Sequence, residues 1–348
     1  MNAYELGADD LVRRFEDWGQ PPYRARQVYA GLWRRSATYE EMTDLPKALR
    51  ARLEEEAPAQ LEVLSEREAD RGATRKALLR LGDSHVVETV VMGYRGRVTV
   101  CVSSQAGCAM GCGFCATGQM GLENNLTAGE IASQVVWGAR AAARLPASPA
   151  RRVTNVVFMG MGEPMANYRA TRDAITRLLD PAGMDLGARH VTVSTVGIVP
   201  GILHIAGDHP QVGLAVSLHA ADDELRNELV PVNKLWPLAE LEEAVSEWRA
   251  RTNRRPSIEW TMMHGVNDGD HQAVLLSPIA RRLHAHVNLI PMNPTAGSDY
   301  RPSTPTRIER FVEVLRRHGV PVTVRDTRGR EIEAACGQLR WELATASR

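Results

Sequence analysis

The sequence has no excess of charge of either sign, because 42 Lys and Arg balance 42 Asp and Glu over 348 residues. This balance excludes a long-range field that attracts nucleic acid, so any RNA binding must come from local basic patches. No apolar run reaches the length of a transmembrane helix, and the N-terminus has no apolar signal-peptide segment. We therefore expect an intracellular, cytoplasmic protein that works as a monomer without membrane attachment.

Cysteine is scarce and clustered. The chain has five cysteines, and four of them lie between residues 101 and 115. In a reducing compartment, clustered cysteines indicate a metal site or a catalytic site rather than stabilising disulfides. Cys108, Cys112 and Cys115 follow a C-x3-C-x2-C spacing in a glycine-rich loop. Soft thiolates of this kind select zinc, Cu(I) or an iron–sulfur cluster.

A fourth ligand is missing from this loop. A structural zinc site needs four ligands, and no further His or Cys stands nearby at zinc-finger spacing. An electron-carrying [4Fe–4S] cluster likewise takes four cysteines. Three thiolates on a [4Fe–4S] cluster leave one iron open, which indicates chemistry rather than a structural role. The alternative is a buried or zinc-bound cysteine cluster that only stabilises the fold.

Periodicity divides the chain into four parts. Residues 1–57 have helical spacing and predict a small accessory domain that binds RNA. Its arginines either face phosphates or form a solvated charged face: Arg24, Arg26, Arg34 and Arg35. Residues 58–97 predict an antiparallel β extension, and residues 98–295 predict the catalytic core. Residues 296–348 add a helix, a strand and a tail that holds Cys336.

In the core, strands alternate with helices. The strand candidates are residues 98–101, 153–159, 190–195, 212–218, 257–262 and 286–290, with one more at 321–325. The helix candidates are residues 128–144, 170–179, 225–230, 238–251, 271–283 and 306–318. This α/β alternation predicts parallel pairing with right-handed crossovers. A partial (β/α)6 barrel fits best, and an open doubly wound sheet is the alternative.

Polar residues follow several of the predicted strands. They are Gly162 and Glu163 in Gly-Met-Gly-Glu-Pro, Ser194, Ser217 with Leu218 and His219, and Asn293. A single residue of this kind is usually a cap or a turn residue. Because the carboxyl ends of successive parallel strands meet at one mouth, the set predicts a ligand site there.

The cysteine loop, with Phe114 directly before Cys115, resembles the cluster loop of the radical S-adenosylmethionine (SAM) enzymes. Further stretches resemble the RlmN family of that superfamily: Cys-Val-Ser-Ser-Gln-x-Gly-Cys, Gly-Met-Gly-Glu-Pro, Ser-Leu-His-Ala, Asn-Leu-Ile-Pro-x-Asn-Pro and Ala-Ala-Cys-Gly-Gln-Leu. The resemblance implies a radical SAM barrel in which Cys108, Cys112 and Cys115 hold a [4Fe–4S] cluster. It also implies SAM contacts by Gly162, Glu163, Ser194, Ser217, Leu218, His219 and Asn293.

The activity implied by this resemblance is methylation of carbon 2 of adenosine in 23S rRNA, at the peptidyl-transferase centre, and in certain tRNAs, next to the anticodon. Two SAM molecules are consumed per turnover. Cys336 becomes S-methylcysteine, and its methylene adds to the adenine after hydrogen abstraction by a 5′-deoxyadenosyl radical. Glu88 accepts the carbon 2 proton, and Cys101 then resolves the adduct through a transient disulfide with Cys336. An electron donor such as flavodoxin with its reductase is implied as a partner.

Three other functions remain open from the residues alone. The related Cfr enzymes methylate carbon 8 of the same rRNA adenosine and share most of these motifs. A radical SAM reaction on a protein or a small molecule would not need Cys336. A non-enzymatic RNA-binding protein would hold zinc rather than iron. Taken singly, Cys101 and Cys336 are typical of small buried apolar residues, and Glu88 of a solvent-facing strand position.

Overall fold

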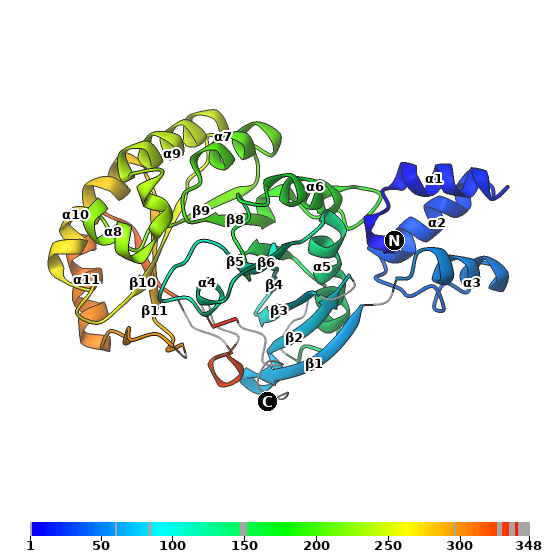
Figure 1. Cartoon of the computed structure of the whole chain (residues 1–348), viewed down its shortest axis with the longest axis horizontal. Helices are drawn as coiled ribbons and strands as arrows, with labels where there is room; N and C mark the ends of the chain where they lie inside the picture. The colour runs from blue at the N-terminus through cyan, green and yellow to red at the C-terminus, as the bar shows by residue number, and fades with distance from the viewer. Residues whose placement is uncertain are drawn as a thin grey trace.

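The computed structural model describes residues 2–59, 61–82, 85–146, 152–295, 297–325, 329–333 and 338–339. Three helices form a separate body at the N-terminal end, drawn in blue at the right of Figure 1: α1 (Ala8–Asp17), α2 (Pro22–Trp33) and α3 (Lys47–Glu56). Their inward faces carry the periodic apolar side chains, including the fully buried Leu11, Phe15, Leu32 and Leu53. Burial of this shared stripe, rather than helix propensity, holds three short helices together.

Polar contacts join this helical body to the rest of the protein. The Tyr29 hydroxyl donates to the carboxylate of Asp180 at 2.6 Å, and Arg140 Nε donates to the carbonyl of Ser36 at 2.7 Å. Arg177 donates to the carbonyls of Tyr4 and Glu5. These bonds fix the helical body beside helices of the core.

A ten-stranded sheet forms the main body, with the order β1-β2-β3-β4-β7-β8-β9-β10-β11-β12. Its antiparallel part is β1 (Glu62–Ala69), β2 (Thr74–Leu81), β3 (His85–Tyr94) and β4 (Arg97–Cys101). Its parallel part continues from β4 through β7 (Asn155–Phe158), β8 (Val191–Thr195), β9 (Gly213–Ser217), β10 (Ser257–Met262), β11 (His286–Pro291) and β12 (Val322–Val324).

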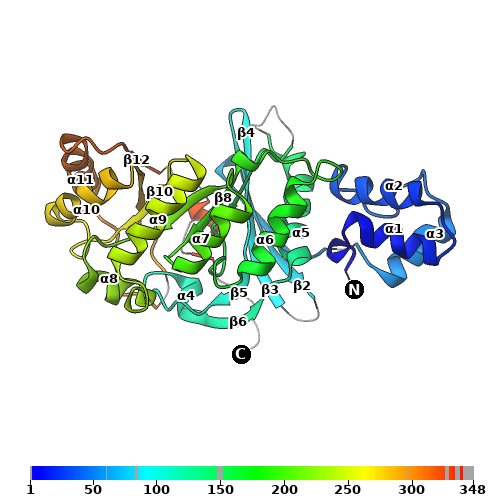
Figure 2. The same ribbon diagram turned by 90° about the horizontal axis from the view of Figure 1, so that it is seen from above.

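The crossover helices lie along the outer face of the curved sheet (Figures 1 and 2). They are α5 (Ala128–Ala142), α6 (Tyr168–Leu179), α7 (Val199–Asp208), α9 (Leu238–Thr252), α10 (Asp270–Arg282) and α11 (Pro305–Arg317). The short helix α8 (Asp223–Leu229) instead packs beside the cysteine loop, where Leu229 shares an apolar cluster with Cys112 and Phe114. The strand order follows the chain order without a reversal. The predicted partial barrel with a helical domain and a β extension is therefore confirmed, and the doubly wound alternative is wrong.

Two local features differ from the prediction. Helix α7 lies between β8 and β9, where the sequence analysis predicted no helix. Pro200 falls in the first turn of α7, a position where proline supports the start of a helix. The cysteine loop carries its own hairpin, in which β5 (Gln105–Cys108) pairs with β6 (Gly121–Asn125), and between them lies the short helix α4 (Ala116–Met120). No helix in the described part of the chain has the length and apolarity needed to cross a bilayer.

Candidate active site

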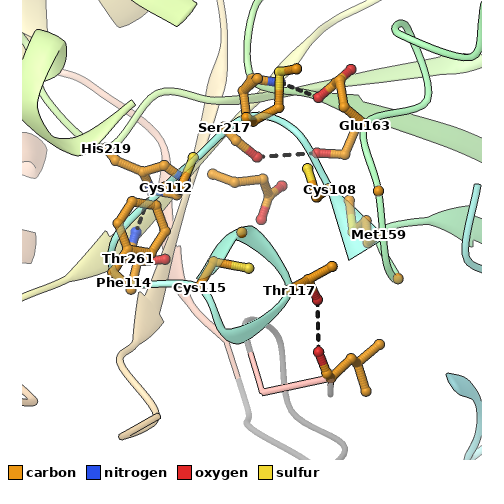
Figure 3. Close-up of a pocket in the computed structure, with 18 of the residues that line it drawn as sticks. Cys108, Cys112, Phe114, Cys115, Thr117, Met159, Glu163, Ser217, His219 and Thr261 are labelled. Atoms are coloured by element: carbon orange, nitrogen blue, oxygen red, sulfur yellow. Dashed lines mark hydrogen bonds between the residues drawn. The ribbon is translucent and has the colours of Figure 1, made fainter. Parts of the chain in front are cut away.

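A cavity opens on the inner side of the barrel, at the carboxyl ends of the parallel strands (Figure 3). It is lined by all but one of the residues that the sequence predicted for the cluster and for SAM: Cys108, Cys112, Cys115, Gly162, Glu163, Ser194, Ser217, His219 and Asn293. The exception is Leu218, which is buried and whose carbonyl accepts from Arg226 Nε at 3.1 Å. Segments distant in sequence thus meet at one mouth, as parallel strand ends require.

The three thiols surround the cavity from the cysteine loop (Figure 3). Burial raises the pKa of Cys108 to about 12 and the pKa of Cys112 well above its ordinary value, and neighbouring thiolates raise both further. Thiolates crowded in this way need a cationic group among them. Among the described residues, no three His, Cys, Asp or Glu side chains are close enough to hold a single ion. A cluster of several irons, each held by a different thiolate, fits this arrangement better than one tetrahedral zinc.

Two glycines allow the backbone to approach closely at this site. Gly162 has φ +93°, and a side chain there would meet Gln105 at 2.5 Å. A side chain at Gly118 would meet the backbone oxygen of Cys112 at 2.9 Å. Both positions therefore need glycine, the first for its backbone conformation as well as for space.

Glu163 is a completely buried acid beside the thiols. Its carboxylate accepts from the backbone N–H of Met165 at 3.0 Å and of Val196 at 2.9 Å. Burial raises the pKa of Glu163 to about 7, although these hydrogen bonds lower it. Each carboxylate oxygen keeps a second acceptor site, so Glu163 can accept from an amino group placed in the cavity.

His219 faces the cavity as a neutral donor. Burial, followed by the nearby charge of Arg226, lowers the pKa of His219 to about 3. Its Nδ1 accepts from the backbone N–H of Thr261 at 3.0 Å, so the ring proton lies on Nε2. The Phe114 ring packs edge-on against it, with ring centroids 4.7 Å apart. The imidazole is therefore held in one orientation and one tautomer.

The residues proposed for chemistry on RNA lie on the inner face of the β extension. Thr89 donates to Gln134 of α5 at 2.7 Å, and the side chain of Val100 packs against Gly138 of the same helix. Because strand side chains alternate, Glu88 and Cys101 point to the opposite, inner face. Both are buried. The structure thus places the two on one face, which the sequence could not show.

The C-terminal tail touches two places on this inner side. The carbonyl of Glu333 accepts from Lys76 Nζ at 3.3 Å on β2, and the carbonyl of Leu339 accepts from Thr117 Oγ1 at 2.7 Å beside the cysteine loop. Cys336 lies outside the described residues, so its predicted role is not tested. No disulfide is found among the residues described, which include Cys101.

Sequence reasoning missed four side chains at or near this site. Glu259 of β10 is buried in the cavity wall, where it accepts from Ser257 and Asn288. Arg226, also fully buried, joins the loops after β8 and β9 through the carbonyls of Val196 and Leu218. Lys76 and Thr117 are the other two. The sequence signal that could have identified Lys76 and Glu259 was a charged residue at a strand position that faces inward.

Comparison with known proteins agrees with this geometry. Residues 102–276 match the model of the "Radical SAM superfamily", and residues 1–58 match the "Ribosomal RNA large subunit methyltransferase N-terminal domain". A crystal structure of a radical SAM methyltransferase from Sphaerobacter thermophilus has a TM-score of 0.94 and 48% identity, over 98% of this chain and 99% of that one.

Curated relatives carry the name "Probable dual-specificity RNA methyltransferase RlmN". The protein from Chloroflexus aurantiacus is 48% identical over 97% of this chain and 92% of its own length. The protein from Salinispora tropica is 53% identical over 97% of this chain and 93% of its own length.

We predict that replacing any one of Cys108, Cys112 and Cys115 by Ala abolishes the cluster, because each thiolate holds a different iron. Anaerobically reconstituted protein should fall from about four irons per chain to nearly none, with loss of the visible absorbance. Cys101→Ala is the matched control and should keep its iron. Full iron content and SAM cleavage in any of the three variants would contradict a three-cysteine cluster.

We predict that SAM binds more tightly as the pH rises from 6 to 8. The ionised carboxylate of Glu163 is a stronger acceptor for the SAM amino group than the neutral acid, because its hydrogen bond is charge-assisted. A pKa of about 7 means that its ionised fraction grows roughly ten-fold over this range. Equilibrium dialysis of cluster-loaded protein measures the affinity. Glu163→Gln should bind SAM more weakly and without this slope, and the same slope in both proteins would exclude Glu163 as its origin.

Proposed function

Because the chain belongs to the RlmN family of the radical SAM superfamily, we propose that it methylates carbon 2 of adenosine in 23S rRNA and in certain tRNAs. The observation that carries the proposal is a cavity surrounded by three thiols in a chain that matches these relatives over nearly its whole length. The relatives' dual-specificity name does not favour the carbon 8 reaction, nor does it favour a protein or small-molecule substrate. A purely structural zinc site does not fit an enzyme of this superfamily.

The chemistry of adenine explains why cysteines beyond the cluster are needed. Carbon 2 is electron-poor and a poor nucleophile, so the methyl group of SAM cannot be transferred to it directly. We propose that Cys336, as a thiolate, first takes a methyl group from one SAM. When bound, the cluster and a second SAM supply a radical able to remove a hydrogen atom from that methyl group.

The remaining steps fall to side chains of the chain itself. The methylene radical on Cys336 joins to carbon 2 of the adenine, Glu88 accepts the carbon 2 proton, and the one electron left over returns to the electron-transfer group that supplied it. The Cys101 thiolate then attacks the sulfur of Cys336, the carbon–sulfur bond breaks, and the released carbon takes up a proton to become the methyl group. The methylated RNA leaves, and the disulfide between the two cysteines must be reduced before the next turnover. An electron donor such as flavodoxin with its reductase supplies the electron for the radical chemistry. Support comes from the flanks of Cys336, since Glu333 contacts the pair formed by Lys76 and Glu88 while Leu339 lines the cavity.

We propose that the helical domain of residues 1–57, together with the core, binds RNA phosphates. A hollow between the two bodies is lined by exposed arginines from both sides: Arg34, Arg35, Arg97 and Arg152. Of these, Arg34 already donates to the carbonyl of Pro181, and Arg35 lies 3.6 Å from Asp44 in a weak, exposed ion pair. On earlier turns of α2, Arg24 donates to Gln20, and Arg26 is exposed.

The proposed order of steps predicts that replacing Cys336 and replacing Cys101 block the reaction at different stages. Cys336→Ala removes the methyl carrier, so neither product nor covalent adduct should form. Cys101→Ala removes only the resolving thiolate and should accumulate a protein–RNA adduct through Cys336. Gel electrophoresis with mass spectrometry of the digest detects the adduct. RNA labelled with deuterium at carbon 2 of the target adenosine shows, in the wild-type product, whether carbon 2 was substituted.

Two results would contradict this function. Equal inactivity of both variants, without an adduct, would make Cys101 a structural residue and leave only the radical SAM assignment. A wild-type product that keeps deuterium on ring carbon 2 and carries its methyl group on carbon 8 would overturn the choice of carbon.

The arginine hollow predicts a change in the salt dependence of RNA binding. Replacing Arg34, Arg35, Arg97 and Arg152 by Gln should lower the slope of log K against log salt by about 0.9 for each phosphate that the protein no longer neutralises. A control variant carries the same change at four arginines that are ion-paired on the core helices: Arg251, Arg282, Arg310 and Arg317. Equal slopes in the two variants would remove the hollow from the RNA interface.

A further inference from the structure

Lys76, which the reaction described above does not use, forms a buried ion pair with Glu88. Lys76 Nζ lies 2.9 Å from Glu88 Oε1, and the two side chains are 5% and 3% exposed. Among the ion pairs of the described residues, this is the one in which both side chains are almost completely removed from water. Each of the other pairs has at least one partner that remains in contact with solvent, such as Arg80 with Glu62 on the neighbouring strand β1.

Stability does not explain such a pair. Removing two charges from water costs several kcal/mol for each ion, and their attraction seldom returns much more than that. Apolar residues of similar volume serve a fold equally well, and the same sheet face has Leu78 and Val90 directly beside the pair. A buried pair that stability does not require is a candidate for function.

The register of the sheet places the pair in line with Cys101, and Lys76 also contacts the described residue Glu333 of the tail. Lys76 pairs with Val90, and Val90 pairs with Cys101, so the three lie in one row across β2, β3 and β4. Glu88 stands two residues from Val90, on the same face. The second contact of Lys76 Nζ is the carbonyl of Glu333, three residues before Cys336.

The backbone of Glu88 also adjoins the cavity wall. Its N–H contacts Met161 Sδ at 3.4 Å, and its carbonyl accepts from Ser103 Oγ at 2.7 Å. Ser103 Oγ accepts in turn from the N–H of Met161 at 2.9 Å. Met161 stands between Gly160 and Gly162, which both line the cavity. Through Ser103 and Met161, the backbone of Glu88 is thus joined to the cavity wall. Lys76 contacts both Glu88, the proposed base, and Glu333, which lies three residues before Cys336 in the sequence.

We propose that Lys76 is the positioning residue of the proton-accepting step, acting through Glu88. This inference rests on the proposed role of Glu88. The Lys76 ammonium keeps the buried carboxylate ionised and oriented, so that it can take a proton. In the step itself the carbon 2–hydrogen bond breaks, its electron pair stays with the ring, and the proton becomes the O–H of Glu88. No oxidant or reductant takes part in this transfer.

A second consequence concerns the tail. An ammonium has three donors, and Lys76 uses one toward Glu88 and one toward the Glu333 carbonyl. The cation that keeps Glu88 ionised thus also holds the backbone of Glu333, which lies three residues before Cys336 in the sequence.

Lys76→Gln tests the role of the charge, because glutamine is neutral but keeps two N–H donors. Lys76→Met removes the donors as well. Arg80→Met is the matched control, since it removes an exposed ion pair from the same strand. Each variant, with Glu88→Gln beside it, reacts with RNA deuterated at carbon 2 of the target adenosine. Iron content, 5′-deoxyadenosine, methyladenosine, adduct and the deuterium in the adduct are measured.

We expect Lys76→Gln to keep its iron and to complete one round of 5′-deoxyadenosine formation. The yield of methyladenosine should fall at least about ten-fold, the loss expected if the pKa of the base rises by one unit. The adduct should accumulate with deuterium still on carbon 2, as in Glu88→Gln. Product formation by Lys76→Gln should recover as the pH rises, because a buried carboxylate without its cation ionises only at higher pH.

The pH comparison separates Glu88 from its neighbours. Among the described residues, the charged or titratable groups that the register places on this face of the neighbouring strands are Lys76 and Arg80 from β2, Glu62 and Arg67 from β1, and Arg97 and Cys101 from β4, while Met161 from the loop after β7 does not titrate. Since all of these groups except Lys76 are present in wild type and variant alike, the difference between their profiles reports Glu88.

The outcomes separate this inference from the proposed function. If Glu88→Gln turns over normally, the role of Glu88 itself is wrong, and the inference ends with it. If Glu88→Gln traps labelled adduct but both Lys76 variants turn over like Arg80→Met, or lose the label from their adduct, the inference alone is overturned. If Lys76→Met does not load iron, Lys76→Gln decides, and an unchanged pH profile there contradicts the proposal.

Discussion

The site depends on acidic groups that are buried together in one cavity. Cys108, Cys112 and Glu163 face one cavity, and burial raises the pKa of each. In the absence of a positively charged group these side chains favour their protonated forms. The cavity therefore favours the binding of cations, and both iron and a positively charged cofactor are cations. Arg226 lies behind the cavity and holds its wall in place by hydrogen bonds to the loops that follow two strands, β8 and β9.

The β extension uses its two faces for different tasks. Thr89 and Val100 attach one face to helix α5, and this contact lets the antiparallel strands act as a fixed platform. The opposite face carries Lys76, Glu88 and Cys101 toward the inner side. Reacting groups that sit on strands are held more rigidly than groups on loops, which suits a proton acceptor that must meet one carbon atom.

The fold and most of the cavity could be predicted from the sequence, because both depend on local patterns. Strand–helix alternation determined the barrel, and residues following strands, such as Glu163 and Asn293, had to meet at one mouth. The pairing of Lys76 with Glu88 could not be predicted, since it depends on the register between two strands. The hairpin of β5 and β6 was missed because a glycine-rich loop has no strand periodicity. Helix α7 was missed because proline and glycine at its start resemble a loop.

In the part of the chain that the structure describes, the sheet is not closed and ends in two edge strands, β1 and β12. An open edge presents unpaired backbone groups to any other chain, and long apolar edges promote aggregation. Here β12 has only three residues, and β1 is largely exposed and carries charged side chains: Glu62, Glu66, Arg67 and Glu68. Shortness protects one edge and charge protects the other. The barrel can thus remain open to a macromolecule as large as RNA without inviting its own copies to add strands.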